Sequence, residues 1–137
     1  MLIRQATKKD LKQCERLGKI PEFELPSGGY MKAQWLESYL DPDFFMIAEE
    51  KDRVIGYFLG EKLIGGVGLL WYIMVHKDFR GKGFGTKLLN EFERRVKKRG
   101  IDWIVLYGPA LNKKTIRFYE KHGYNKGKTF YEFNKLL

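Results

Sequence analysis

The chain has 137 residues, 44% of them hydrophobic and 15% aromatic, which is enough to bury a core and argues against disorder. Its one cysteine, Cys14, excludes an internal disulfide framework and fits a reducing cytoplasm, where we expect the protein to act; no run approaches the about 20 apolar residues of a membrane span. The net charge of +9 fits a polyanionic partner, such as nucleic acid, an anionic membrane or a phosphorylated small molecule, and it fits a lysine-rich solvated surface equally well.

The first third of the chain predicts one strand and two helices. Residues 2–7 alternate between apolar and polar as a strand does. Thr7 and, three residues later, Asp10 nearly match a capping box, which predicts the start of a helix. A loop rich in proline and glycine over 19–30 separates it from a second, short helix over 31–40.

The middle of the chain predicts a hairpin and then two buried strands joined by a helix. Residues 44–50 and 54–62 are the strands of the hairpin. Residues 67–76 and 101–108 are mostly apolar strands, and between them residues 86–99 carry an apolar stripe at helical spacing. A strand, a helix and a strand with a short return predict a parallel pair and a right-handed crossover.

The C-terminal part predicts a helix over 112–121 and an edge strand over 128–136. The expected element order is therefore βααβββαβαβ, an α/β fold with a mixed sheet and helices on both faces. The chain shows no linker, repeat or low-complexity tract, so we expect a single domain over 1–137.

A glycine-rich loop, Arg-Gly-Lys-Gly-Phe-Gly, joins the buried strand to the amphipathic helix at residues 80–85. It is not a dinucleotide fingerprint, since Thr86 stands where the third glycine belongs, and it is not a Walker A loop, since Lys87 follows the threonine instead of preceding it. Glycines there permit positive φ and let several N–H groups point at one anion beside a helix N-terminus. The alternative is a tight turn that binds nothing.

The loop resembles the pyrophosphate loop of the GNAT N-acetyltransferases, whose pattern is [Q/R]-x-x-G-x-[G/A]: Arg80, Gly83 and Gly85 fill the fixed positions. A second stretch, "NKKTIRFYEKHGY" at 112–124, is similar to another motif of that family. The opening "IRQATKKDL" is also typical of it, and the order of elements agrees from end to end. The residues that match the second motif are Asn112, Phe118, Tyr119, Gly123 and Tyr124.

The resemblance implies acetyl transfer from acetyl-CoA, with two central parallel strands that splay apart to admit the pantetheine arm. The arm would pair with the backbone of the earlier strand, and a free N–H near Met74 or Val75 would polarise the thioester carbonyl. No metal is expected. The residues that the resemblance assigns to the cofactor are Ile73, Met74, Val75, Arg80, Gly81, Lys82, Gly83, Phe84, Gly85, Thr86, Asn112 and Tyr119.

The resemblance also implies that Tyr119 protonates the departing thiolate, although a tyrosine on this helix is also compatible with core packing alone. The base that deprotonates the amine stays open. Relatives of the ribosomal-protein-alanine type carry a glutamate at the position of Tyr107, and a neutral phenol is a poor base at pH 7. The other candidates are Glu22, Glu24, Glu49, Glu50 and His76, and a water relay is an alternative.

The acceptor is expected to be a small-molecule or peptide amine bound by residues 19–40. Their acidic and aromatic side chains suit a cation with an apolar body, and a flexible surface loop is the alternative. Two other functions stay open: a non-catalytic acyl-CoA-binding regulator, and a nucleic-acid-binding domain that uses the basic stretch 92–100. We interpret that stretch as a solvated helix end, which disfavours nucleic acid. We expect a monomer or homodimer. The candidate acceptor-binding residues are Glu22, Phe23, Glu24, Tyr30 and Trp35.

Overall fold

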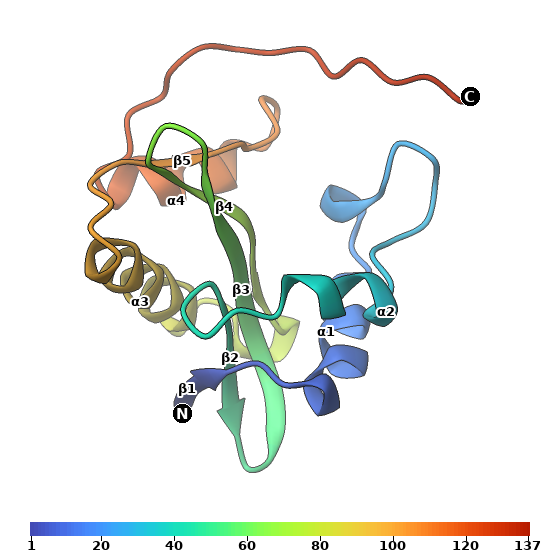
Figure 1. The fold of residues 1–137 in the computed structure, drawn as a ribbon, viewed down its shortest axis with the longest axis vertical. Coiled ribbons are helices and arrows are strands. Elements are labelled where there is room, and N and C mark those ends of the chain that lie inside the picture. Colours follow the sequence, from blue (N-terminus) through green and yellow to red (C-terminus); the bar gives the residue numbers. More distant parts are fainter.

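The sheet has five strands in the order β1-β2-β3-β4-β5 in the computed structural model, which describes residues 1–137 (Figure 1). The first four strands pair antiparallel, and β5 lies parallel to β4. This is the mixed sheet that the sequence predicts, with α3 joining the parallel pair. The strands are β1 Leu2–Gln5, β2 Phe45–Glu50, β3 Arg53–Leu63, β4 Val67–Val75 and β5 Ile104–Leu106.

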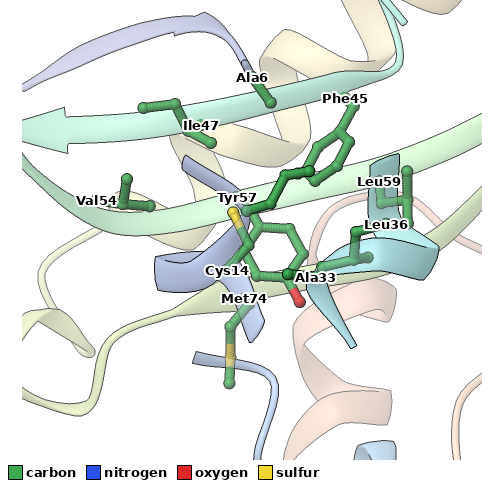
Figure 2. Close-up of a cluster of buried hydrophobic side chains, with 11 residues drawn as sticks. Ala6, Cys14, Ala33, Leu36, Phe45, Ile47, Val54, Tyr57, Leu59 and Met74 are labelled. Atoms are coloured by element: carbon green, nitrogen blue, oxygen red, sulfur yellow. The ribbon is translucent and has the colours of Figure 1, made fainter. Parts of the chain in front are cut away.

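Helices cover both faces of the sheet, which confirms the predicted α/β class. Tyr57 and Leu59 of β3 pack with α1 and α2 on one face (Figure 2), while Ile55 and Phe58 pack with α3 and α4 on the other. A strand that is covered on both sides buries side chains of both orientations. The helices are α1 Leu11–Leu17, α2 Ala33–Leu36, α3 Phe84–Lys98 and α4 Lys113–Lys121, with 3-10 turns η1 Lys8–Asp10, η2 Pro21–Phe23, η3 Glu37–Tyr39 and η4 Lys77–Phe79.

The predicted apolar stripe of α3 is buried against the sheet. Leu88 and Phe92 are fully buried, and Val96 is 1% exposed, so each contributes roughly 2 kcal/mol through burial. Gly60 of β3 lets the helix approach, because a Cβ there would lie 2.5 Å from the Phe92 ring. Like the shorter helices, α3 lacks the length and apolar character that crossing a bilayer requires.

The basic end of α3 is not the freely solvated face that we expected. Arg95, Lys98 and Arg99 hold the carboxylate of Asp43 at 3.1, 3.3 and 2.5 Å. Asp43 is only 6% exposed, and the Arg99 hydrogen bond, followed by that of Lys98, lowers its pKa against the opposing effect of desolvation. These cations therefore tie α3 to the segment before β2.

The predicted edge strand over 128–136 does not form. No regular secondary structure follows α4, and in Figure 1 this segment crosses the top of the molecule as an extended trace. Its aromatic residues Phe130, Tyr131 and Phe133 are 70%, 86% and 93% exposed. Alternating side chains only favour a strand locally, and a strand needs a partner to satisfy its backbone groups.

Candidate active site

The glycine loop adopts the conformation for which its glycines were singled out. Gly81 and Gly83 have φ of 72° and 83°, values that other residues rarely adopt. A Cβ at either position would meet nothing within 4 Å, so packing does not explain these glycines. Backbone with positive φ at alternate residues can form a nest of N–H groups that suits an anion.

The first turn of α3 adds unpaired donors to this surface. Gly83 is the N-cap residue and has no side chain to cap the helix, and the first hydrogen bond of the helix runs from the Lys87 N–H to the Gly83 carbonyl at 3.1 Å. The backbone N–H groups of Phe84, Gly85 and Thr86 precede that bond and have no acceptor in the protein. The positive end of the helix dipole lies at the same place.

The two cations of the loop bind its own backbone. The Arg80 Nε donates to the carbonyl of Val75 at 2.9 Å, and the Lys82 Nζ donates to the carbonyl of Asp78 at 3.0 Å. Both side chains are on exposed residues. Each therefore adds positive charge beside the loop while it fixes the loop to the segment that precedes it.

The parallel strands separate in front of this loop. β4 and β5 pair only from Gly68 with Ile104 to Leu70 with Leu106. At the same point the register of β4 against β3 shifts at Trp71, a bulge that bends the strand. Residues 71–75 therefore have no strand beside them on the β5 side.

Alternation along β4 decides which backbone groups face the opening. The His76 N–H donates to the Ile55 carbonyl of β3 at 2.7 Å, so Met74, two residues back, also faces β3, and Ile73 and Val75 face away from it. The Arg80 bond to the Val75 carbonyl agrees with this assignment. Of the two expected positions for a free N–H, Met74 and Val75, this alternation favours Val75, because the Met74 backbone faces β3. The Met74 side chain is buried on the α1 and α2 side (Figure 2).

α4 reaches the same place from the other side. A Cβ on Gly85 would lie 3.6 Å from the Phe118 ring and 3.9 Å from a methyl group of Val75. The end of β4, the start of α3 and the middle of α4 therefore converge at Gly85. Asn112 caps α4 by accepting the Thr115 N–H at 3.1 Å.

Tyr119 packs on α4 between two other aromatic rings. Its centroid lies 5.2 Å from that of Phe118 and 5.6 Å from that of Tyr124. Burial raises the pKa of Tyr119 to about 12. A phenol is protonated at neutral pH even at its ordinary pKa of about 10, and burial makes this one a weaker acid. No hydrogen bond within the protein engages the Tyr119 hydroxyl, which is not fully buried.

Three of the residues considered as bases have other roles. Glu49 binds Arg4 at 2.7 Å. Both ring nitrogens of His76 are engaged: the Nδ1 accepts the Asp78 N–H at 3.2 Å, and the Nε2 lies 2.8 Å from the Arg53 guanidinium. Tyr107 is 66% exposed and stacks edge-on with Phe130 at 6.3 Å. Glu50 lies at the end of β2, beside the β2–β3 turn.

The other two carboxylates lie on a segment that touches the separated part of β4. Glu22 and Glu24 flank Phe23, whose ring centroid is 4.6 Å from that of Tyr72. Both carboxylates are exposed. The neighbouring crevice is narrow, and Lys32 lies 5.3 Å over the Trp35 ring that we expected to bind an acceptor cation. The crevice holds only about 10 Å³ and is lined by Cys14, Gly18, Phe23, Met31, Leu36, Tyr57 and Tyr72.

The sequence reading missed His122, which joins α4 to the glycine loop. The His122 Nε2 lies 2.9 Å from the Thr86 hydroxyl, and its Nδ1 lies 2.6 Å from the Phe118 carbonyl. The His122 and Phe118 rings also pack against each other, with centroids 4.5 Å apart and planes tilted by 46°. The only signal in the sequence is a histidine four residues after Phe118, which is one turn further along the helix.

Comparison with known proteins identifies one family. Residues 8–124 match the model described as the acetyltransferase (GNAT) family. An acetyltransferase from Photorhabdus laumondii is 38% identical over 84 residues, which are 61% of this chain and 58% of that relative. The match thus spans less than two thirds of the relative's own length.

Two solved structures share the fold. A transcriptional regulator from Bacillus halodurans superposes with a TM-score of 0.80 at 19% identity, over 98% of this chain and 99% of its own. A ribosomal-protein-alanine N-acetyltransferase from Brucella melitensis superposes with a TM-score of 0.76 at 22% identity. The superposition covers 90% of this chain and 83% of that protein. Their different descriptions at such low identity mean that the likeness shows the fold alone.

Proposed function

Because the chain belongs to the acetyltransferase (GNAT) family, we propose that it transfers the acetyl group of acetyl-CoA to a primary amine of a small molecule or peptide, as one domain over residues 1–137. The observation that carries the proposal is the row of unpaired N–H groups at the start of α3, beside the opening between β4 and β5. The thiol ester supplies an activated acetyl group, and the amine attacks it directly.

The glycine loop suits the pyrophosphate of the coenzyme. Gly81 and Gly83 leave open the space that a Cβ would fill, and the N–H groups of Phe84, Gly85 and Thr86 need an acceptor. Arg80 and Lys82 add positive charge at its edge. An anion would satisfy all of these groups at once.

The open edge of β4 suits the pantetheine arm. The amides of the arm would pair with the backbone of Ile73 and Val75, as an added strand does. An N–H of this edge would donate to the thioester carbonyl as negative charge develops on it. Of the two expected positions, Val75 would supply this N–H, because the Met74 backbone faces β3.

Two proton transfers remain for the side chains. Tyr119, a phenol that is protonated at neutral pH, would donate a proton to the leaving thiolate. The amine has a pKa near ~10 and must lose a proton. Glu22 and Glu24 are the carboxylates best situated to accept it, directly or through water, because Phe23 holds their segment against Tyr72.

A non-catalytic acyl-CoA-binding regulator is the second candidate, since an exposed tyrosine stands at position 107 in place of a carboxylate. One experiment separates the two. Calorimetry with coenzyme A should show binding, and thiol release from acetyl-CoA should accelerate with at least one member of a panel of amines and peptides. Binding without turnover for any acceptor would favour the regulator, and no binding would refute both.

A further inference from the structure

The hydrogen bonds of His122 determine where its ring proton lies. The Phe118 carbonyl can only accept, so the Nδ1, at 2.6 Å, carries the hydrogen. In the neutral ring the Nε2 then has only a lone pair, and the Thr86 hydroxyl at 2.9 Å must donate to it. The hydroxyl hydrogen of Thr86 therefore points at His122, away from any other acceptor.

This orientation is unfavourable for a phosphate at the glycine loop. Thr86 lies in the first turn of α3 and its backbone N–H has no acceptor. With its hydrogen engaged, its hydroxyl offers only lone pairs to a neighbouring anion. A protonated His122 would donate from Nε2 to the hydroxyl oxygen, which would release the hydroxyl hydrogen for the anion.

We propose that His122 is a positioning residue that takes up a proton when a coenzyme phosphate binds, and so turns the Thr86 hydroxyl from His122 to the phosphate. The inference rests on the proposed function. The arriving anion favours the imidazolium. By linkage, affinity for the coenzyme then falls as pH rises through the protonation range of the complex.

No charged side chain of the protein contacts the His122 ring. Its ring contacts Phe118 of α4 and Thr86 of α3, and no carboxylate oxygen lies within 4.0 Å of its ring nitrogens. The Lys87 ammonium of α3 lies 5.6 Å over the Phe84 ring. The carboxylate of Glu93 is engaged by Tyr124 at 2.9 Å, and Glu120 and Lys121 of α4 are exposed.

The test uses dephospho-coenzyme A, because the 3′-phosphate of coenzyme A itself titrates near pH ~6. NMR of the wild-type protein follows the pH titration of the two histidine rings with and without this ligand, and a His76→Gln variant assigns them. The His122 midpoint should rise by roughly half to one unit, the low end of the effect of a nearby opposite charge. Affinity measured by calorimetry should be about 3- to 10-fold weaker at pH 8.5 than at pH 5.5.

Two variants separate positioning from a merely structural role. His122→Gln keeps a donor toward Thr86 without a titratable ring, so its affinity should not vary with pH over this range. Thr86→Val should bind more weakly and should lose most of the pH dependence. Binding that leaves the His122 midpoint unchanged overturns this inference alone, and no binding at any pH overturns the acetyltransferase proposal with it.

Discussion

Alanine substitutions at Gly83 and Gly85, two glycines of the same loop, should change the stability of the protein in opposite directions. Gly83 has φ of 83°, and an L-residue in that region costs about 1–2 kcal/mol. Gly85 lies in the first turn of α3, where a Cβ would make ordinary contacts of 3.6–3.9 Å. Its replacement by alanine should therefore stabilise the helix by up to about 1 kcal/mol.

The two variants should differ even more in binding. At Gly83 the new methyl group enters the space proposed for the phosphate and the strained turn misaligns the N–H groups. Loss of one such charge-assisted hydrogen bond, worth ~1.5–3 kcal/mol, lowers affinity roughly 10- to 100-fold. Gly83→Ala should lose that much affinity for coenzyme A and melt about 4–8 °C lower. Gly85→Ala should bind within about two-fold of wild type.

Calorimetry and thermal melts on both variants check this reasoning. If Gly83→Ala keeps the wild-type affinity, the loop does not hold the phosphate. If both variants lose affinity equally, the conformation of Gly83 has no special role. Thermal melts without ligand are needed beside the calorimetry, because backbone strain lowers stability while exclusion of the ligand lowers affinity, and the two effects are independent.

The other predictions concern Tyr119 as the proton donor, the ion pairs of Asp43 and the C-terminal residues 128–137. Tyr119→Phe should lower kcat about 10²- to 10⁴-fold with coenzyme affinity little changed, and near-normal turnover with chemistry rate-limiting would remove Tyr119 from the mechanism. Asp43→Asn should cost roughly 1–2 kcal/mol in urea unfolding at neutral pH, because Lys98 and Arg99 are partly exposed. Because the folded-state pKa of Asp43 is lowered, this contribution is present above about pH 4 and is lost as pH falls further; an equal cost at pH 2 would contradict it. Removal of 128–137 should shift the melting temperature by less than about 4 °C, since these residues are exposed, and a large drop would show that the tail packs on the fold.

Patterns of residues close together in the sequence correctly predicted the buried face of α3 and the turn of the glycine loop. The stripe of Leu88, Phe92 and Val96 recurs at the spacing of one helix face, and all three are buried. The positive φ of Gly81 and Gly83 agrees with the glycine loop as read from the sequence. In each case the residues that decide the structure lie within a few positions of one another.

Features that depend on distant partners could not be predicted in this way. The alternation over 128–136 is real, but whether a strand forms depends on an edge elsewhere in the chain. Asp43 meets Arg99 across 56 positions of sequence, and Thr86 meets His122 across 36. Helical charge patterns, which compare residues three or four apart, contain no information on such pairs.

Arg80 illustrates how one residue can serve both ends of the proposed site. The resemblance assigns it to the cofactor, and its charge does lie at the edge of the glycine loop. Its Nε, however, donates to the carbonyl of Val75 at 2.9 Å, the residue whose backbone faces the opening between β4 and β5. The bond fixes the distance between the loop that suits the phosphates and the strand edge that suits the pantetheine arm. Under the proposed function a ligand that spans both would have to match that distance, and Arg80 would then contribute to selectivity for an extended coenzyme over a free phosphate.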